Sequence, residues 1–219
     1  MPNHKILTHQ SNFIFGYGFL VNIKNLEQYL KRKLQPDLNH KICSLKDYQR
    51  CWNVAMNNQV NLPNYKYYRD RTKQRIDAFV TFLNIRPHPN KNILGILFRV
   101  TDAELISLDS RERNYQRINI TKQLDIQIQG NAWTYIGLPA AEQRYQTGLA
   151  QNKAVIDRTY FNSVEDAYLA LGNKEHANYV ATTDKPLASI IDLEVCRSKI
   201  QNDIISRTET EGLNQNAIA

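Results

Sequence analysis

Residues 76–112, IDAFVTFLNIRPHPNKNILGILFRVTDAELISLDSRE, contain the pattern that decides the fold. Residues 76–85 predict a strand that ends at Pro87 and Pro89, because proline has no backbone N–H to give to a neighbouring strand. Residues 92–100 are apolar almost throughout, which is typical of a strand buried in the centre of a sheet. The stretch therefore predicts two strands in succession, followed by a change to helical periodicity.

The helix predicted after these strands runs to about Glu112. Thr101 followed by Glu104 indicates a capping box, in which each side chain accepts a hydrogen bond from a backbone N–H at the start of the helix. Leu105, Leu108 and Glu112 follow the i, i+3, i+7 spacing and share one stripe. A carboxylate on an apolar stripe must be paired, neutralised or used, because stranding it away from water is costly.

The rest of the chain alternates between strand and helix patterns without a regular βαβ order. Further strands are predicted at residues 12–20, 45–56, 115–120 and 132–137. Further helices are predicted at residues 26–34, 140–149, 164–171 and 193–205, and Gly172 ends the third of these. We therefore expect an α+β fold with a mixed, partly closed sheet flanked by helices.

Composition and charge narrow the class of protein. The chain has 219 residues, with 42% hydrophobic and 22% charged residues and a net charge of +7, as in a globular protein. No apolar run approaches the roughly 18 residues of a transmembrane helix. The polar residues 1–10 predict no secretory signal. We expect one domain over residues 1–207 with a frayed tail at 208–219, in the cytoplasm.

Common catalytic and metal-binding signatures do not occur in the sequence. The three cysteines, Cys43, Cys51 and Cys196, match no disulfide framework and no zinc motif, which indicates reduced thiols. The five histidines are scattered, and no Walker loop or G-x-S-x-G elbow is present. The Gly16-x-Gly18 pair lacks a third glycine and is therefore a weak dinucleotide signal.

The segment NFIFGYGFL, residues 12–20, predicts a strand that opens into a tight turn. Its aromatic residues recur with a period of two, and Gly16 and Gly18 share the opposite face. Glycine inside a strand often marks a place where another group approaches the backbone closely. We therefore expect a turn with exposed backbone N–H groups.

Two interpretations of Glu112 stay open. In the first, it ends its helix and turns to water or pairs with Arg99 or Arg117. In the second, it faces the interior, where burial raises the pKa of a carboxyl group towards the range in which it can take and give a proton.

The basic segment 65–75 supplies +4 of the net charge and has three tyrosines among its cations. The cations are Lys66, Arg69, Arg71, Lys73 and Arg75. Such a segment is either a solvated loop between strands or a surface that binds a polyanion and stacks bases.

Two of these motifs together resemble the γ-glutamylcyclotransferase family, including its glutathione-acting branch. The matching residues are the strand and turn IFGYGFL at 14–20, residues 45–53, and the strand and helix at 95–115 that contain GILF and LDxRExxY. A looser match covers residues 160–172. The resemblance implies a barrel-like mixed sheet on which the glycine turn and the glutamate share one cavity.

The resemblance also implies an activity and a set of site residues. Family members convert a γ-glutamyl amine or peptide into 5-oxoproline and the free amine, with a glutamate as general acid and base; Glu112 matches that position. The implied substrate-binding residues are Gly16, Tyr17, Gly18, Phe19 and Leu20, with Tyr115 either adding a hydroxyl contact or packing as a strand tyrosine. No metal or organic cofactor is implied, and the expected partner is a small γ-glutamyl molecule rather than a membrane or a nucleic acid.

One residue departs from the family pattern. The turn usually reads Y-G-S-[LN], and Phe19 replaces the serine here, so a hydroxyl is lost and a large ring enters the turn. Two alternatives to the enzyme therefore stand beside it: a catalytically silent protein that binds a γ-glutamyl-like or other small anion, and a polyanion-binding protein that uses residues 65–75.

Overall fold

The computed structural model describes residues 11–60 and 65–197. The chain divides into two compact units, a larger one of Met1–Asn57 and Ala78–Ile191 and a smaller one of Asn58–Asp77 and Asp192–Ala219. Each unit is described by itself. The single domain expected over residues 1–207 stays a prediction, and the expected signal-free segment 1–10 and tail 208–219 lie outside the described residues.

The larger unit is built on a seven-stranded mixed sheet. Its strands are β1 (Asn12–Gly16), β2 (His40–Asn57), β4 (Phe79–Val100), β5 (Tyr115–Asn119), β6 (Asn131–Gly137), β7 (Ala154–Asp157) and β8 (Ser189–Ile191). They follow the order β5-β6-β1-β4-β7-β8, and β2 pairs with β4 beside this path. β1 and β2 pair antiparallel with β4, whereas β7 pairs with it in parallel. The predicted α+β fold with a mixed sheet is confirmed.

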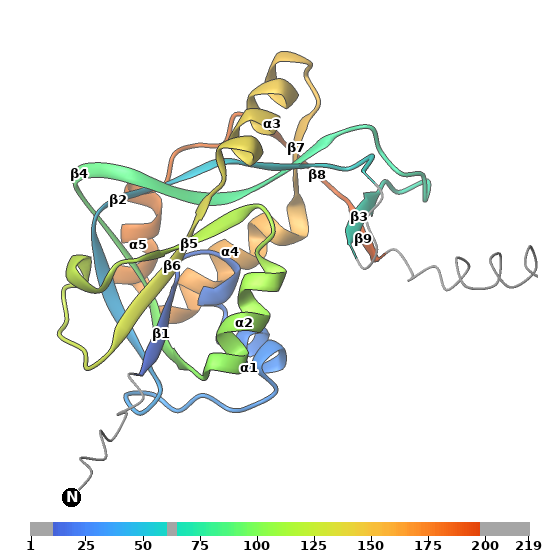
Figure 1. Ribbon diagram of the computed structural model, residues 1–219. Helices are drawn as coiled ribbons and strands as arrows, with labels where there is room; N and C mark the ends of the chain where they lie inside the picture. The colour runs from blue at the N-terminus through green and yellow to red at the C-terminus, as the bar shows by residue number, and fades with distance from the viewer. Residues whose placement is uncertain (1–10, 61–64, 198–219) are drawn as a thin grey trace, which may run out of the picture. The chain divides into compact units, whose positions relative to one another are not determined.

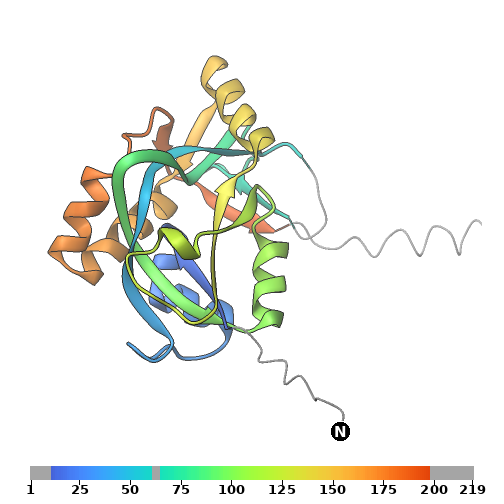
Figure 2. The same cartoon turned by 60° about the vertical axis from the view of Figure 1, so that its left-hand side comes forward.

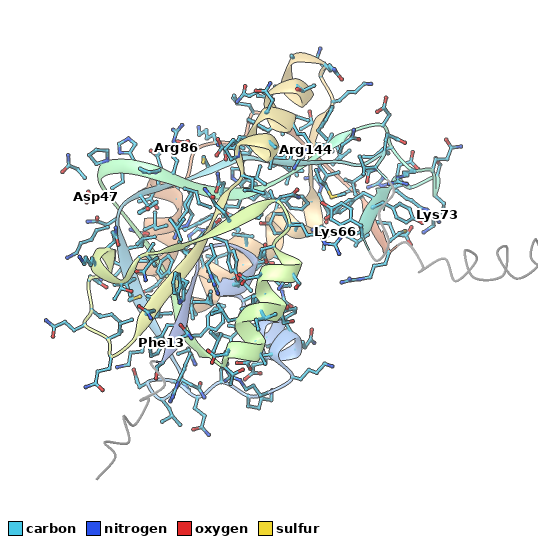
Figure 3. The ribbon with its side chains drawn as sticks, viewed as in Figure 1. Phe13, Asp47, Lys66, Lys73, Arg86 and Arg144 are labelled. Atoms are coloured by element: carbon cyan, nitrogen blue, oxygen red, sulfur yellow. The ribbon has the colours of Figure 1, made fainter. Side chains whose placement is uncertain are left out.

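The long strands β2 and β4 run side by side and curve together (Figures 1 and 2). Residues 79–100 form one strand, so the prediction that Pro87 and Pro89 end a strand is wrong. Among the described residues, β4 pairs only with β2 near these prolines, and residues two apart direct their backbone nitrogens to the same edge. The prolines therefore fit the open edge without costing a ladder hydrogen bond. Figure 3 shows Asp47 and Arg86 extending outward from this hairpin.

Helices cover the sheet of the larger unit. They are η1 (Phe19–Val21), α1 (Ile23–Leu30), α2 (Asp102–Arg111), η2 (Thr121–Gln123), α3 (Pro139–Ala150), α4 (Arg158–Leu171) and α5 (Asn173–Ala181). The predicted capping box of α2 is confirmed, with Thr101 accepting from the Glu104 N–H and the Glu104 carboxylate from the Thr101 N–H. α4 ends at Gly172 as predicted but begins six residues earlier than expected, because Asp157 caps it.

The apolar faces of these elements meet in one core. Ile14 of β1, Phe98 of β4, Leu108 of α2 and Val164 of α4 are fully buried. α1 lies against α2, where the Tyr29 hydroxyl is 2.8 Å from Ser107 Oγ. This packing fixes the end of α2 beside the end of β1, where the glycine turn begins.

The smaller unit contains a two-stranded antiparallel sheet of β3 (Lys66–Arg69) and β9 (Glu194–Arg197). The prediction of a helix at 193–205 is therefore wrong over 194–197, and the remaining residues from 198 lie outside the described part of the chain. Pairing with β3 overrides the helical pattern, since four residues of one strand match four of the other in register. No helix in the described ranges is long and apolar enough to cross a membrane.

Candidate functional site

The larger unit contains a pocket of about 400 Å³, part of it open to solvent, between the glycine turn and the end of α2. It is lined by Phe15, Gly16, Tyr17, Gly18, Phe19, Leu20, Leu83, Glu112, Tyr115, Tyr135 and Tyr160. All seven residues that the sequence analysis assigned to the site are in this lining. The structure also adds four that it did not assign.

The glycine turn closes tightly at its first residue. A Cβ atom on Gly16 would lie 2.7 Å from Leu20 Cβ and 2.9 Å from the Leu20 carbonyl oxygen, so a side chain does not fit there. The Val21 N–H donates to the Gly18 carbonyl over 2.9 Å and closes η1. The first N–H groups of such a helix have no partner within it, so the turn presents donors at the pocket.

A buried arginine supports the turn from behind. Arg50 is fully buried, and its Nε donates to the Tyr17 carbonyl over 3.4 Å. The Tyr168 hydroxyl donates to the same carbonyl over 2.9 Å and accepts from Arg50 Nη2 over 2.7 Å. The carbonyl of Tyr17 is therefore held away from the pocket by two fixed donors.

The guanidinium of Arg50 is satisfied by neutral groups. Further donor bonds run to Thr182 Oγ1 over 2.7 Å and to the Leu94 carbonyl. The Arg50 guanidinium also lies 4.7 Å from the centre of the Tyr168 ring and 5.5 Å from that of Tyr179. Cation–π contact of this kind stabilises a charge that is removed from water.

Glu112 is the C-cap of α2, and its N–H donates to the Leu108 carbonyl over 2.9 Å. Its side chain is 20% exposed and is part of the pocket lining, with Oε1 at 3.6 Å from Arg111 Nε. Arg117, which was one expected partner, instead contacts Asp109 at 3.3 Å. The position of Glu112 agrees with the inward-facing interpretation of this residue.

Four phenols surround the Glu112 carboxylate. Burial raises the pKa of Tyr17, Tyr115, Tyr135 and Tyr160, and the negative charge of Glu112 raises the pKa of each one further. These hydroxyls therefore stay protonated at any pH at which the protein works, and the pocket places one acid group among neutral aromatic walls.

Three of these hydroxyl hydrogens are donated to the protein. Tyr17 donates to the Tyr135 carbonyl over 2.7 Å, Tyr135 to Asp109 Oδ1 over 2.9 Å, and Tyr115 to the Leu83 carbonyl over 2.7 Å. Tyr115 therefore shapes the wall rather than offering its hydrogen to the pocket. Tyr160 differs, because its oxygen accepts from the Leu83 N–H over 3.4 Å.

Phe19 packs against a cation. The Arg111 guanidinium lies 4.4 Å from the centre of the Phe19 ring and 4.7 Å from that of Tyr29, between the two rings. The ring that replaces the expected hydroxyl is thereby fixed at the pocket wall beside Glu112.

The cations of the smaller unit are largely engaged by their own unit. Arg71 pairs with Asp192, and the Lys73 ammonium lies 2.7 Å from Glu194, which lowers the pKa of that carboxyl group. The guanidinium groups of Arg69 and Arg75 lie 5.3 Å and 4.7 Å from the centre of the Tyr67 ring. Figure 3 labels Lys66 on β3 and Lys73 in the turn that follows it.

Residues of the pocket that sequence reasoning missed come from unrelated elements. Phe15, Leu83, Tyr135 and Tyr160 belong to β1, β4, β6 and the first turn of α4. Phe15 sits in the alternating aromatic pattern of the first strand, which was a usable signal. Nothing in the local patterns around the other three distinguishes them from core residues. No group of three or more potential metal ligands occurs within residues 11–60 and 65–197.

Comparison with known proteins gives structural neighbours and no sequence relatives. No family model and no curated protein matches the sequence. The chain is similar to a γ-glutamyl cyclotransferase, with 11% identity, a TM-score of 0.47, and coverage of 92% of this chain and 99% of that one. It is also similar to a glutathione-specific γ-glutamyl cyclotransferase from yeast, with 10% identity, a TM-score of 0.46, and coverage of 80% and 97%.

A further neighbour is a protein from Arabidopsis thaliana, with 17% identity, a TM-score of 0.40, and coverage of 63% of this chain and 76% of that one. The neighbours thus include γ-glutamyl-cyclotransferase-like proteins at low sequence identity, as the two motifs predicted. Because every TM-score is below 0.5, the proposal below rests on the pocket and not on these likenesses.

Proposed function

We propose that this protein cyclises a γ-glutamyl amine or peptide to 5-oxoproline and releases the free amine. The observation that carries the proposal is the shared pocket of Glu112 and the glycine turn, which come from segments about 95 positions apart in the chain. Such a pocket supplies the two things that this reaction needs: a proton carrier and a set of backbone donors facing it.

The reaction would use Glu112 as general base and then as general acid. The α-amino group of the substrate loses a proton to the carboxylate and attacks its own γ-carbonyl carbon, forming the ring C–N bond. The bond to the leaving amine then breaks, and Glu112 returns the proton to the leaving nitrogen. No net change in charge or oxidation state occurs, and no metal ion enters any step.

The walls of the pocket would favour this chemistry. The N–H groups of residues 18–20 would receive the anionic end of the substrate or the developing oxyanion. Gly16, Tyr17 and Leu20 set the shape of this turn, and Tyr115 fixes the opposite wall. Because the nucleophile and the carbonyl belong to one molecule, holding the glutamyl arm in a folded shape supplies much of the acceleration.

The test compares 5-oxoproline release from γ-glutamylalanine by the wild-type protein and by Glu112→Gln. We expect turnover by the wild type and a loss of about 100-fold or more in kcat for Glu112→Gln, since a positioned acid–base group contributes this much. Asp166→Asn, which removes an exposed carboxylate on α4, is the matched control and should keep full activity. Equal turnover by the wild type and Glu112→Gln would refute the role of Glu112.

The position of Phe19 favours a second candidate, a protein that binds a γ-glutamyl-like anion without turning it over. The ring is held on Arg111 and replaces a hydroxyl in the turn, so the pocket would retain the ligand in an unproductive pose. Binding of γ-glutamylalanine without any 5-oxoproline release would support this candidate against the enzyme.

A further inference from the structure

Tyr160 is the one pocket phenol whose hydroxyl hydrogen is not donated to another group among the described residues. Tyr17, Tyr115 and Tyr135 give theirs to a carbonyl or a carboxylate. The only hydrogen bond of the Tyr160 hydroxyl in the described part of the chain is the one that its oxygen accepts from the Leu83 N–H. A phenol both donates and accepts, so its hydrogen stays available to a molecule in the pocket.

This hydroxyl faces the glycine turn. It lies 3.6 Å from the place that a Cβ atom on Gly18 would occupy, and Tyr160 lines the same pocket as Glu112. A ligand held by the N–H groups of the turn would therefore have the Tyr160 hydroxyl as a neighbour. The structure thus places a donor hydroxyl beside a turn in which Phe19 supplies none.

The Tyr160 ring is fixed before any ligand arrives. Its backbone N–H donates to Asp157 Oδ2 over 3.2 Å at the start of α4. The ring packs edge-on against Trp52 and Phe82, with centroid distances of 5.9 Å and 5.5 Å. A donor that is held in place in this way costs little conformational entropy when it engages a ligand.

We propose that Tyr160 is a catalytic residue of this pocket, whose hydroxyl donates a hydrogen bond to the γ-carbonyl oxygen of the substrate. The inference rests on the proposed function and deepens it. As the ring C–N bond forms, the π electrons of the carbonyl move onto this oxygen, and they return when the bond to the leaving amine breaks. Tyr160 keeps its proton throughout and stabilises the charged oxygen together with the turn.

The experiment measures kcat and KM for γ-glutamylalanine with Tyr160→Phe, which removes only the hydroxyl. We expect kcat to fall about 100-fold with KM changed little, because an oxyanion donor acts mainly in the transition state. The matched control is Tyr145→Phe, since the Tyr145 phenol also receives a backbone hydrogen bond, from Leu187, but lies outside the pocket lining. It should stay within about twofold of the wild type.

The outcomes separate this inference from the proposed function. If the wild type releases 5-oxoproline and Tyr160→Phe keeps kcat within about threefold, the role of Tyr160 is overturned and the cyclase stands. If the wild type releases none, the cyclase is overturned, and calorimetric titration with γ-glutamylalanine decides for Tyr160. Binding at least about fivefold weaker in Tyr160→Phe than in Tyr145→Phe then supports a ligand contact; equal binding, or no binding by the wild type, overturns it.

Discussion

Replacing Arg50 with methionine should destabilise the larger unit by about 3 kcal/mol. The guanidinium of Arg50 is fully buried and donates to Tyr17, Leu94, Tyr168 and Thr182. Each hydrogen bond from a charged donor is worth about 1.5–3 kcal/mol, and removal of the cation also relieves its desolvation. The Tyr168 hydroxyl still reaches the Tyr17 and Leu94 carbonyls, so the net loss is smaller than the sum.

Urea unfolding followed by tryptophan fluorescence measures this loss, because Trp52 lies buried on the same strand as Arg50. Arg86→Met is the control: the Arg86 side chain is 52% exposed in its ion pair with Asp184, and such pairs contribute about 0–1 kcal/mol. The reasoning is refuted if the two variants lose the same stability. We also expect Arg50→Met and Tyr168→Phe to be non-additive by at least about 1 kcal/mol, since they share two carbonyl partners.

Three further predictions concern the turn and the thiols. Gly16→Ala should destabilise the protein by about 1–3 kcal/mol in the same urea assay, because the new methyl group overlaps Leu20; an unchanged midpoint would contradict the tight turn. Phe19→Ser should raise kcat/KM for γ-glutamylalanine about tenfold if the ring hinders the turn, and unchanged kinetics would show that it does not. Burial raises the pKa of the Cys43 and Cys51 thiols from 9.0 to about 12, so the stability they add is complete below pH 9 and is lost as the pH rises from 9 towards 12; unfolding midpoints that stay constant over this range would disprove it.

Local chemistry made some parts of the fold predictable. The Thr101 and Glu104 pair marks the start of α2, because the two side chains satisfy backbone groups within the same turn. The strand over residues 92–100 was predictable from its apolar run, and the inward position of Glu112 followed from its spacing to Leu105 and Leu108. These features depend on neighbours within a few residues.

Other parts depend on distant partners. Whether Pro87 ends a strand depends on which edge of β4 is open, and Glu194–Arg197 is a strand because Lys66–Arg69 pairs with it. Tyr160 resembles an ordinary helix residue in the sequence, and its free hydroxyl hydrogen is visible only when the partners of the other phenols are known. The pocket wall therefore required the structure, whereas its acid and its turn did not.

A crystal structure of the protein with 5-oxoproline bound tests the central claim most directly. The account predicts that the lactam ring lies in the pocket, with its nitrogen within hydrogen-bond distance, about 3 Å, of the Glu112 carboxylate and an oxygen on the backbone N–H groups of residues 18–20. 5-Oxoproline bound away from Glu112, or in the pocket with neither contact, would contradict the account.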